Sequence, residues 1–341
     1  MLLLDYQNTL IQSILTERFS GAPPVHIDQT LSDFDGVIFH ISNPFELEKD
    51  DDGKEVKIYI KTKIIVSIWI SCYEDLVKFK AKELLEREYE GYVTDPENDN
   101  NPNRPVKKYN FSLEVDLEKL PTEKEKRDEL IKKISLLKRN AMAAPFQKAY
   151  EEHYKLKEEA SKYTSEEAPQ GVREGGQVMA IKYRDEEAIY IKSSHDRVTV
   201  IFSTMFKEET DRVFGKVFVQ EFVDARKRAI QNAPQVLFRN EPPLELHGVP
   251  GVATSANGEV GYVTFVLFPR HLTPQRMPEV ISHIQTFRTY FHYHIKASKA
   301  YIHSRMRRRT ADFLQVLRRA RPENEEKERK TASGRSFRSQ G

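Results

Sequence analysis

The sequence predicts an α+β fold: two similar domains, each a mainly antiparallel sheet packed with helices, followed by a long C-terminal helix. Strand-like runs come in groups and are joined by turns too short for a parallel crossover, which favours antiparallel pairing. A helical pattern follows the strands in each half of the chain. The last helical pattern continues for about ten turns, more than a helix needs to cover one small sheet.

Length and composition fit this organisation. A chain of 341 residues suits two domains better than one, because single hydrophobic cores stop growing at roughly 250–300 residues. Hydrophobic residues make up 39% and charged residues 31%, so there is apolar material for two cores and a surplus of charged surface. The net charge of +2 does not by itself indicate nucleic acid. A single cysteine, Cys72, excludes an intramolecular disulfide framework and fits a reducing compartment.

The first domain is predicted over residues 1–163. An amphipathic helix opens it and ends at Gly21, Pro23 and Pro24. The segment 57–70 alternates at first and then becomes almost wholly apolar, as in a central strand covered on both faces. The predicted elements are, in order, a helix over 2–19, strands over 25–31, 36–42 and 56–71, a helix over 73–90, an exposed loop over 95–105, a strand over 109–117, and helices over 122–142 and 145–163.

The second domain is predicted over residues 178–321, after a linker over 164–177. It repeats the order of three strands, a helix, and further strand and helix. Its predicted elements are strands over 178–184, 187–193 and 197–206, a helix over 208–229, strands over 235–246 and 260–268, and a helix over 278–321. Residues 322–341 are polar and mixed in charge, which predicts a disordered tail.

Targeting and membrane signals are weak in this sequence. The start has no basic leader and its apolar run is short. No segment approaches the roughly 20 apolar residues that a membrane span needs. We therefore expect no signal peptide and no membrane insertion, and a cytoplasmic protein.

The long C-terminal helix carries two apolar stripes. For residues 278–300 the helix's own domain and a partner explain the apolar face equally well. For residues 301–321 the excess length and width favour a partner helix or subunit. The main stripe is Ile284, Phe287, Phe291, Ile295, Ser298, Ile302, Met306, Phe313 and Leu317, and the second is Tyr290, His294, Ala297 and Tyr301.

Phosphate-binding and metal-binding motifs give no support for an enzyme. Neither a GxxxxGK[ST] nor a GxGxxG element is present. Asp33 and Asp35 form a DxD that a metal-dependent transferase could use, but an aspartate between two strands more often caps backbone amides. The acidic alternation from Asp95 to Asn101 lacks the glycine and the terminal glutamate of a calcium loop.

The nucleophile candidates are equally weak. Ser194, His195 and Asp196 are adjacent and cannot converge as a triad from one turn. The histidines at 292 and 294 point to different faces of a helix and are poor joint metal ligands. Cys72 has no CxxC partner and reads as a small core residue. We therefore predict a protein that is not an enzyme and that holds no cofactor or metal.

The charge pattern of the last helix is positive evidence for an acidic partner. Residues 296–321 hold nine positive charges against one negative charge, about +8 on one helix. Solvated faces usually mix the two signs, so this block indicates nucleic acid, anionic lipid or an acidic protein such as actin. The aromatic residues keep apolar spacing rather than alternating with the arginines, which weakens the nucleic-acid interpretation.

Six segments of the chain carry a resemblance to one family. They are SDFDGVIFHISNP (32–44), DRVTVIFSTMF (196–206), GKVFVQEF (215–222), APQVLFRNEPPLEL (233–246), GYVTFVLFPRH (261–271) and TFRTYFHYHIKASKAYIHSRMRRRTADFLQVLRRARP (286–322). The last of the six is the longest and the most specific. In this order the segments resemble stretches of the second subunits of the actin-related protein 2/3 complex, which builds branched actin networks.

This resemblance implies a scaffold subunit with two similar α/β domains, whose long helix lies against the helix of subunit four. The pair would form the core of the complex and supply much of the contact with the side of the mother actin filament. Nucleotide would bind the actin-related subunits instead. The expected location is the cytoplasmic actin cytoskeleton, including cortical actin patches.

Together with the stripes and the basic block, the resemblance gives two expected surfaces. The partner-subunit interface is expected at Tyr290, His294, Tyr301, Met306, Phe313 and Leu317. The actin-filament contact is expected at Lys296, Lys299, Arg305, Arg307, Arg308 and Arg309. The alternative is a basic module that binds nucleic acid or anionic lipid, which the basic block alone supports.

Overall fold

A computed structural model describes residues 5–49, 55–94, 109–163, 169–228, 231–252, 259–320, 329–330 and 336–337. The acidic alternation in the 95–105 loop lies outside the described residues, as does most of the 322–341 tail. The chain divides into two compact units, Met1–Phe291 and His292–Gly341. The predicted domain boundaries at 163 and 178 stay a prediction.

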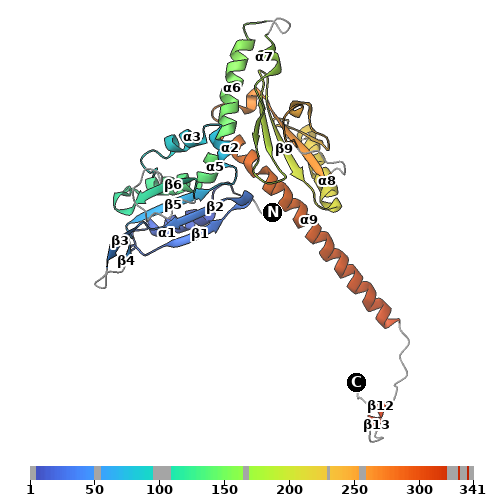
Figure 1. The fold of residues 1–341 in the computed structure, drawn as a ribbon. Helices are drawn as coiled ribbons and strands as arrows, with labels where there is room; N and C mark the ends of the chain where they lie inside the picture. Colours follow the sequence, from blue (N-terminus) through green and yellow to red (C-terminus); the bar gives the residue numbers. More distant parts are fainter. Residues whose placement is uncertain are drawn as a thin grey trace. The chain divides into compact units, whose positions relative to one another are not determined.

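Antiparallel sheets form the framework of the larger unit (Figure 1). Over the described residues, a four-stranded sheet has the order β1-β2-β5-β6, a five-stranded sheet has the order β10-β11-β9-β8-β7, and β3 pairs with β4 in a separate hairpin. The strands are β1 (Asp28–Ser32), β2 (Ile38–Ser42), β3 (Phe45–Lys49), β4 (Glu55–Tyr59), β5 (Lys63–Trp69), β6 (Phe111–Asp116), β7 (Met179–Ile181), β8 (Ile189–Ser193), β9 (Val198–Met205), β10 (Gln235–Arg239) and β11 (Val260–Leu267).

Helices accompany both sheets, and the α+β class with a long C-terminal helix is confirmed. The α-helices are α1 (Thr9–Arg18), α2 (Tyr73–Val77), α3 (Ala81–Glu88), α4 (Lys124–Ser135), α5 (Leu137–Ala141), α6 (Ala144–Ala160), α7 (Gln170–Glu174), α8 (Glu209–Arg228) and α9 (Met277–Arg319). Short 3-10 turns lie at η1 (Phe34–Gly36), η3 (Leu117–Lys119), η4 (Leu244–Leu246) and η5 (Pro269–His271), and two-residue strands at β12 (Arg329–Lys330) and β13 (Ser336–Phe337).

The central strands are the ones that the sequence marks as most apolar. β5 lies between β2 and β6, and its residues between Lys63 and Trp69 are buried. β9 lies between β8 and β11, and it is buried up to Met205. A strand buried on both faces needs apolar side chains at successive positions, which explains these runs.

The single strand predicted over 56–71 is wrong. The chain turns at 60–62, where the amide of Lys63 donates to the carbonyl of Ile60 at 3.2 Å. The alternating half becomes β4, which pairs with β3 and leaves Val56 and Ile58 exposed. The apolar half becomes β5 in the first sheet.

Two predicted helices are each two helices in the structure. The 73–90 helix breaks at Lys80, whose φ of 67° is left-handed, and the 122–142 helix breaks at Leu136 between α4 and α5. The first helix begins at Thr9, where the side chain of Asn8 caps it by accepting from the amide of Ile11 at 3.0 Å. The predicted linker contains α7, and the strand predicted to 246 ends at Arg239.

A cluster of phenylalanines packs α8 and the start of α9 on the second sheet. Phe206 contacts Phe238 and Phe291, with ring centroids 6.5 and 6.2 Å apart. Glycines leave room for its ring: a Cβ at Gly215 in α8 or at Gly261 in β11 would lie 2.8 or 2.7 Å from the Phe206 ring. The core of the second sheet therefore depends on close backbone approach at two positions.

Candidate interaction surface on the C-terminal helix

The first turns of α9 bury the main apolar stripe in the larger unit. Ile281, Ile284 and Phe291 are buried. Phe287 lies between rings of the second sheet, 4.7 Å from Phe265 and 5.5 Å from Phe202 between centroids. Up to Phe291, the helix's own domain therefore explains the apolar face, and the alternative that the sequence left open is resolved for this segment.

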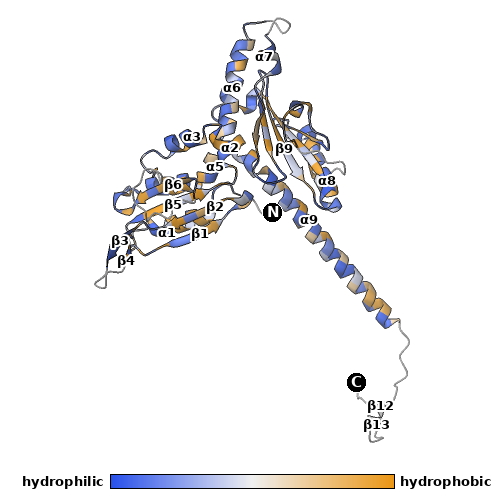
Figure 2. Cartoon of the chain, in the orientation of Figure 1, coloured by the Kyte–Doolittle hydropathy of each residue, from blue (hydrophilic) through white to orange (hydrophobic). Residues whose placement is uncertain are grey.

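Further along α9 the same stripe is uncovered. Ile295 is 1% exposed, whereas Met306 is 63% and Phe313 is 62% exposed. Figure 2 shows that hydrophobic residues continue into the last turns of the helix. The other exposed apolar side chains of this stretch, among the described residues, are Tyr301, Ile302, Leu314, Val316 and Leu317. Apolar side chains thus continue at the same spacing along the helix, but beyond Ile295 no other part of the described chain buries them. We call residues 301–317 the distal stripe.

Positive charge surrounds the distal stripe. Arg307, Arg308 and Arg309 are consecutive and exposed, so they point to three directions around the helix. Arg309 follows Met306 by three residues and precedes Phe313 by four, which places it on the stripe itself. Arg305 donates to the Tyr301 hydroxyl at 3.2 Å, and its guanidinium lies 5.6 Å from the centre of that ring.

A shallow groove marks one end of this surface. It is lined by Tyr301, Ile302, Arg305, Met306, Arg309 and Thr310. Its walls combine an aromatic ring and two aliphatic side chains with two guanidinium groups. Such a groove suits an apolar side chain flanked by carboxylates.

The remaining residues of the two expected surfaces are more covered. Tyr290 and His294 are half-buried, and so is Lys299, whereas Lys296 is exposed. The second stripe is thus partly covered at its start and exposed at Tyr301. Whether these residues touch a partner subunit or a filament stays a prediction. Arg321, the last charge of the basic block, lies outside the described residues.

The residues that could have carried catalysis have structural roles. Asp33 caps η1, because its Oδ1 accepts from the amide of Phe34 at 2.6 Å. Ser194, His195 and Asp196 lie in the turn between β8 and β9. Burial raises the pKa of the Cys72 thiol to about 12, so its reactive thiolate form is scarce at neutral pH. The capping, hairpin and core interpretations of these residues agree with the structure.

Metal-binding clusters and membrane-spanning helices are the two remaining kinds of functional element. Within the described part of the chain, His, Cys, Asp and Glu side chains nowhere gather in threes that could hold a metal ion. The helices of the described residues are too short or too polar to cross a lipid bilayer.

The sequence did not reveal a buried ion pair between Glu187 and Arg288. The Glu187 side chain is 4% exposed and accepts from Arg288 of α9 at 2.7 Å. The two residues are 101 positions apart, and each looks like an ordinary surface charge in the sequence. No local pattern could have found this pair.

The fold and the distal stripe together define a class: an α+β protein whose C-terminal helix carries an uncovered, basic, amphipathic stretch. The profile of the family described as "Arp2/3 complex, 34 kD subunit p34-Arc" matches residues 66–324. The chain belongs to this family.

Curated relatives agree with the family match over the whole length. A protein of Schizosaccharomyces pombe called "Actin-related protein 2/3 complex subunit 2" is 51% identical over 341 residues, which cover 99% of this chain and 99% of the relative. A protein of Dictyostelium discoideum with the same name is 36% identical over 340 residues, again covering 99% of both chains. The resemblance inferred from the six segments is confirmed.

Proposed function

We propose that this chain is a structural, non-enzymatic subunit of the Arp2/3 complex. Its distal stripe binds the helix of subunit four, and its basic block contacts the side of the mother actin filament. The family match and the names of the relatives support membership of the complex. The observation that carries the finer proposal is the loss of cover along one continuous stripe between Ile295 and Met306.

The energetics favour a partner for the distal stripe. Burying a side chain such as Met or Phe contributes roughly 1.5–3 kcal/mol. Met306 and Phe313 are both more than half exposed, so together they offer about 2–4 kcal/mol of burial to a partner surface. A helix with apolar side chains every three or four residues would bury them by ridge-and-groove packing.

Arg309 specifies one further property of the partner. It interrupts the apolar stripe with a guanidinium between Met306 and Phe313. A partner that covers both neighbours must also face this charge, and an unpaired buried guanidinium costs several kcal/mol. The partner helix is therefore expected to place a carboxylate opposite Arg309, held by paired hydrogen bonds.

Co-expression with subunit four tests the apolar part of the proposal. The isolated chain should aggregate or express poorly, and co-expression should rescue it. Phe313→Asp and Leu317→Asp should each weaken binding by about 2 kcal/mol or more. Gln315→Asp, which adds the same charge on the opposite side of the helix from Phe313 and Leu317, is the control and should leave binding unchanged. A well-behaved monomer whose affinity for subunit four survives both substitutions would refute the interface.

The filament contact is proposed for Lys296, Lys299, Arg305, Arg307 and Arg308. Arg309 was expected in the same contact, but its place on the stripe assigns it to the subunit-four interface in this proposal. Actin is acidic, and several like charges steer and orient docking, whereas each exposed pair contributes roughly 0–1 kcal/mol. Single substitutions should therefore have small effects. Reversing Arg305, Arg307 and Arg308 together should weaken filament cosedimentation and branching, and the deficit should shrink at high salt.

Gel filtration of the triple variant separates the two roles of these arginines. An intact complex with reduced filament binding supports the filament contact. A complex that falls apart assigns the arginines to subunit four. An intact complex with unchanged filament affinity would leave the basic block as solvated surface and would refute its proposed role.

The proposed location is the cytoplasmic actin cytoskeleton, including cortical actin patches. The alternative function, a module that binds nucleic acid or anionic lipid, rests on the basic block alone. Salt-dependent cosedimentation with actin filaments, compared with binding to RNA and to anionic vesicles, discriminates between them. Tighter binding to RNA or vesicles than to filaments would favour the alternative.

A further inference from the structure

Charged side chains of the larger unit form an alternating series that ends on α9. Lys138 of α5 lies between the two aspartates of the η1 turn, 3.5 Å from Asp33 and 3.7 Å from Asp35. Arg184, which follows β7, donates twice to Asp35 Oδ1, from Nη2 at 2.8 Å and from Nε at 3.0 Å. This part of the series joins the first sheet to the second.

Glu187 continues the series to α9. Its Oε2 lies 3.6 Å from Nε of Arg184 and 2.7 Å from Nη2 of Arg288. Its Oε1 accepts from the amide of Met205 at 3.1 Å. The carboxylate thus has partners from β9 and α9 and from the segment between β7 and β8, although it is 4% exposed.

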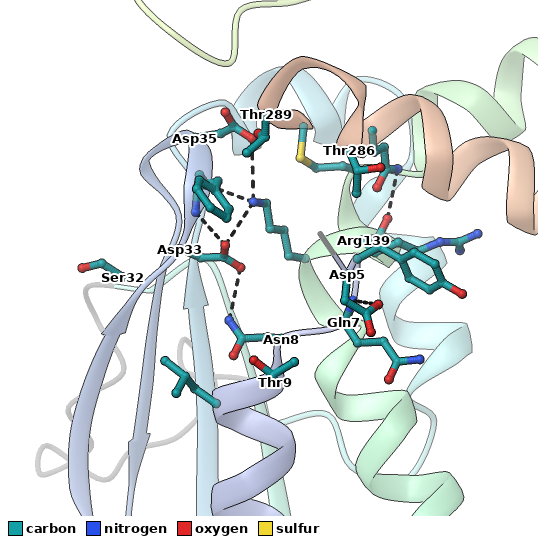
Figure 3. Close-up of a pocket in the computed structure, with 16 residues that line it drawn as sticks. Asp5, Gln7, Asn8, Thr9, Ser32, Asp33, Asp35, Arg139, Thr286 and Thr289 are labelled. Carbon is teal, nitrogen blue, oxygen red and sulfur yellow. Dashed lines mark hydrogen bonds and ion pairs between the residues drawn. The ribbon is translucent and has the colours of Figure 1, made fainter. Parts of the chain in front are cut away.

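Arg139, the neighbour of Lys138, gives α5 a second connection to α9. Arg139 donates from Nη2 to the carbonyl of Pro278 at 2.6 Å and from Nε to the hydroxyl of Ser282 at 3.0 Å. The side chain of Gln285 donates back to the carbonyl of Arg139 at 3.2 Å. Figure 3 shows Arg139, Asp33 and Asp35 around a cavity that Thr286 and Thr289 of α9 also line. We call Asp33, Asp35, Lys138, Arg139, Arg184, Glu187 and Arg288 the charged ring.

Apart from Arg139, which donates to groups of α9, the charges of the ring balance. Asp33, Asp35 and Glu187 face Lys138, Arg184 and Arg288, and the exposed fractions of these side chains run from 4% to 35%. Burying a charge is costly unless an opposite charge lies beside it, and each of these groups has such a neighbour. Removing one carboxylate would leave a guanidinium without its strongest partner in a place where water compensates poorly.

Hydrophobic contacts alone tolerate sliding, whereas directional ion pairs fix one arrangement. Two further hydrogen bonds join the segments before the second sheet to its strands and their neighbours. The hydroxyl of Ser193 donates to the carbonyl of Ala149 at 3.0 Å, and the amide of Lys182 donates to Asp75 at 3.2 Å. The charged ring is the place where both sheet regions and the base of α9 meet through ion pairs and short hydrogen bonds.

We propose that the charged ring positions the base of α9 relative to both sheets, with Asp35 and Glu187 as its positioning residues. A base of α9 that is held in one arrangement has fewer conformations to give up when a partner binds the helix, which favours binding. This inference rests on the proposed function of the distal stripe.

The test uses the full-length chain, alone and assembled with the other subunits. Spin labels replace Lys119 and Lys207, whose side chains are 83% and 81% exposed and which follow strands of the first and second sheets. A third label site at the exposed His283 of α9 is paired in turn with each of them. Double electron–electron resonance then measures the distance distributions between the two sheets and between the base of α9 and each sheet. Asp35→Asn and Glu187→Gln remove one charge each. Asparagine tolerates the left-handed φ of 64° at position 35, so this change isolates the charge.

The matched control is Asp196→Asn, which removes a carboxylate that pairs with its exposed neighbour Arg197 at 2.8 Å. Both ring variants should broaden the distance distribution and weaken subunit binding about tenfold, a middle value for coupled contacts. The control should do neither. Arg184→Lys, which keeps the charge and loses the double hydrogen bond, should fall between wild type and Asp35→Asn.

The outcomes separate this inference from the proposed function. A distribution as narrow as wild type in both ring variants, with only a lower melting temperature, would show mere stabilisation and overturn the inference. A broadened distribution in a chain whose binding does not respond to Phe313→Asp would keep the ring and overturn the proposed role of the distal stripe. If the Glu187→Gln variant does not fold, the distance distribution of the Asp35→Asn variant, at a less buried position, tests the inference by itself.

Discussion

Replacing Gly215 by alanine tests how tightly α8 is packed on the second sheet. Alanine is the better helix former by about 1 kcal/mol, so propensity alone predicts stabilisation. The structure predicts the opposite sign. A Cβ at this position would lie 2.8 and 2.9 Å from two atoms of the Phe206 ring and 3.4 Å from Phe291. These approaches require the ring or the helix to shift.

Phe206 has little freedom to move aside. It is 3% exposed, and on its other side Gly261 makes an equally close approach, 2.7 Å from a built Cβ. Overpacking a core of this kind costs about 1–3 kcal/mol. Taking the upper value, because the ring is confined on both sides, and subtracting the propensity gain leaves about 2 kcal/mol of destabilisation. For a chain of 341 residues that lowers the melting temperature by roughly 3 °C.

Urea unfolding and thermal melting of the full-length chain measure this change. Gly171→Ala is the matched control, because it also lies in a helix and nothing lies within 4 Å of its built Cβ. The control has the propensity gain without the clash, so it should be unchanged or stabilised by up to about 1 kcal/mol. Adding Phe206→Leu to Gly215→Ala should recover part of the loss. A melting temperature raised by Gly215→Ala would refute the reasoning, because propensity would then outweigh packing.

Other parts of the fold give further predictions. Burial depresses the pKa of His153 below its ordinary value of 6.5. Because the unfolded chain then binds the proton more readily, stability is unaffected above that pH and falls below it, by at most about 1.4 kcal/mol per pH unit. Urea unfolding at about pH 7 and about pH 5 should differ less in His153→Gln than in wild type, and an equal difference would contradict this origin. Cys72, whose pKa burial raises to about 12, should react with a thiol reagent far more slowly in the native than in the unfolded chain. Equal rates would disprove its core role. Tyr89→Phe should cost about 1–3 kcal/mol, because it removes a hydrogen bond to the carbonyl of Lys133 at 2.7 Å and the acceptor of the Asn140 amide. An unchanged denaturation midpoint would show that neither bond contributes.

The best sequence predictions concern long periodic elements. The C-terminal helix was expected over 278–321 and spans Met277–Arg319, because an amphipathic pattern of this length has few competing interpretations. The breaks at Lys80 and Leu136 were missed because neither position carries glycine or proline. The strand over 56–71 was predicted as one piece for the same reason, since its turn residues lack the usual turn chemistry.

Some features of the candidate site could likewise be predicted from the sequence, and others could not. The chemistry of the distal stripe follows from spacing, and the excess of apolar surface follows from its length. The position along α9 at which the stripe becomes exposed to solvent cannot be predicted in this way, because Ile295 and Ile302 are the same residue type in the same pattern, although one is buried and the other exposed. The charged ring could not be predicted from the sequence for a different reason. Its pairs join Asp35 to Arg184 and Glu187 to Arg288, and only the tertiary fold brings such distant charges together.

Hydroxyl-radical footprinting of the C-terminal helix tests the central claim most directly. Met306 and Phe313 react readily with hydroxyl radicals when water reaches them, and they are 63% and 62% exposed in the chain alone. Modification rates are compared between the isolated chain, diluted until light scattering shows it to be monomeric, and the assembled complex. The proposed interface predicts that both rates fall severalfold on assembly, while Phe291, already 2% exposed, stays slow in both samples. Rates for Met306 and Phe313 that are the same in the complex as in the isolated chain would contradict it.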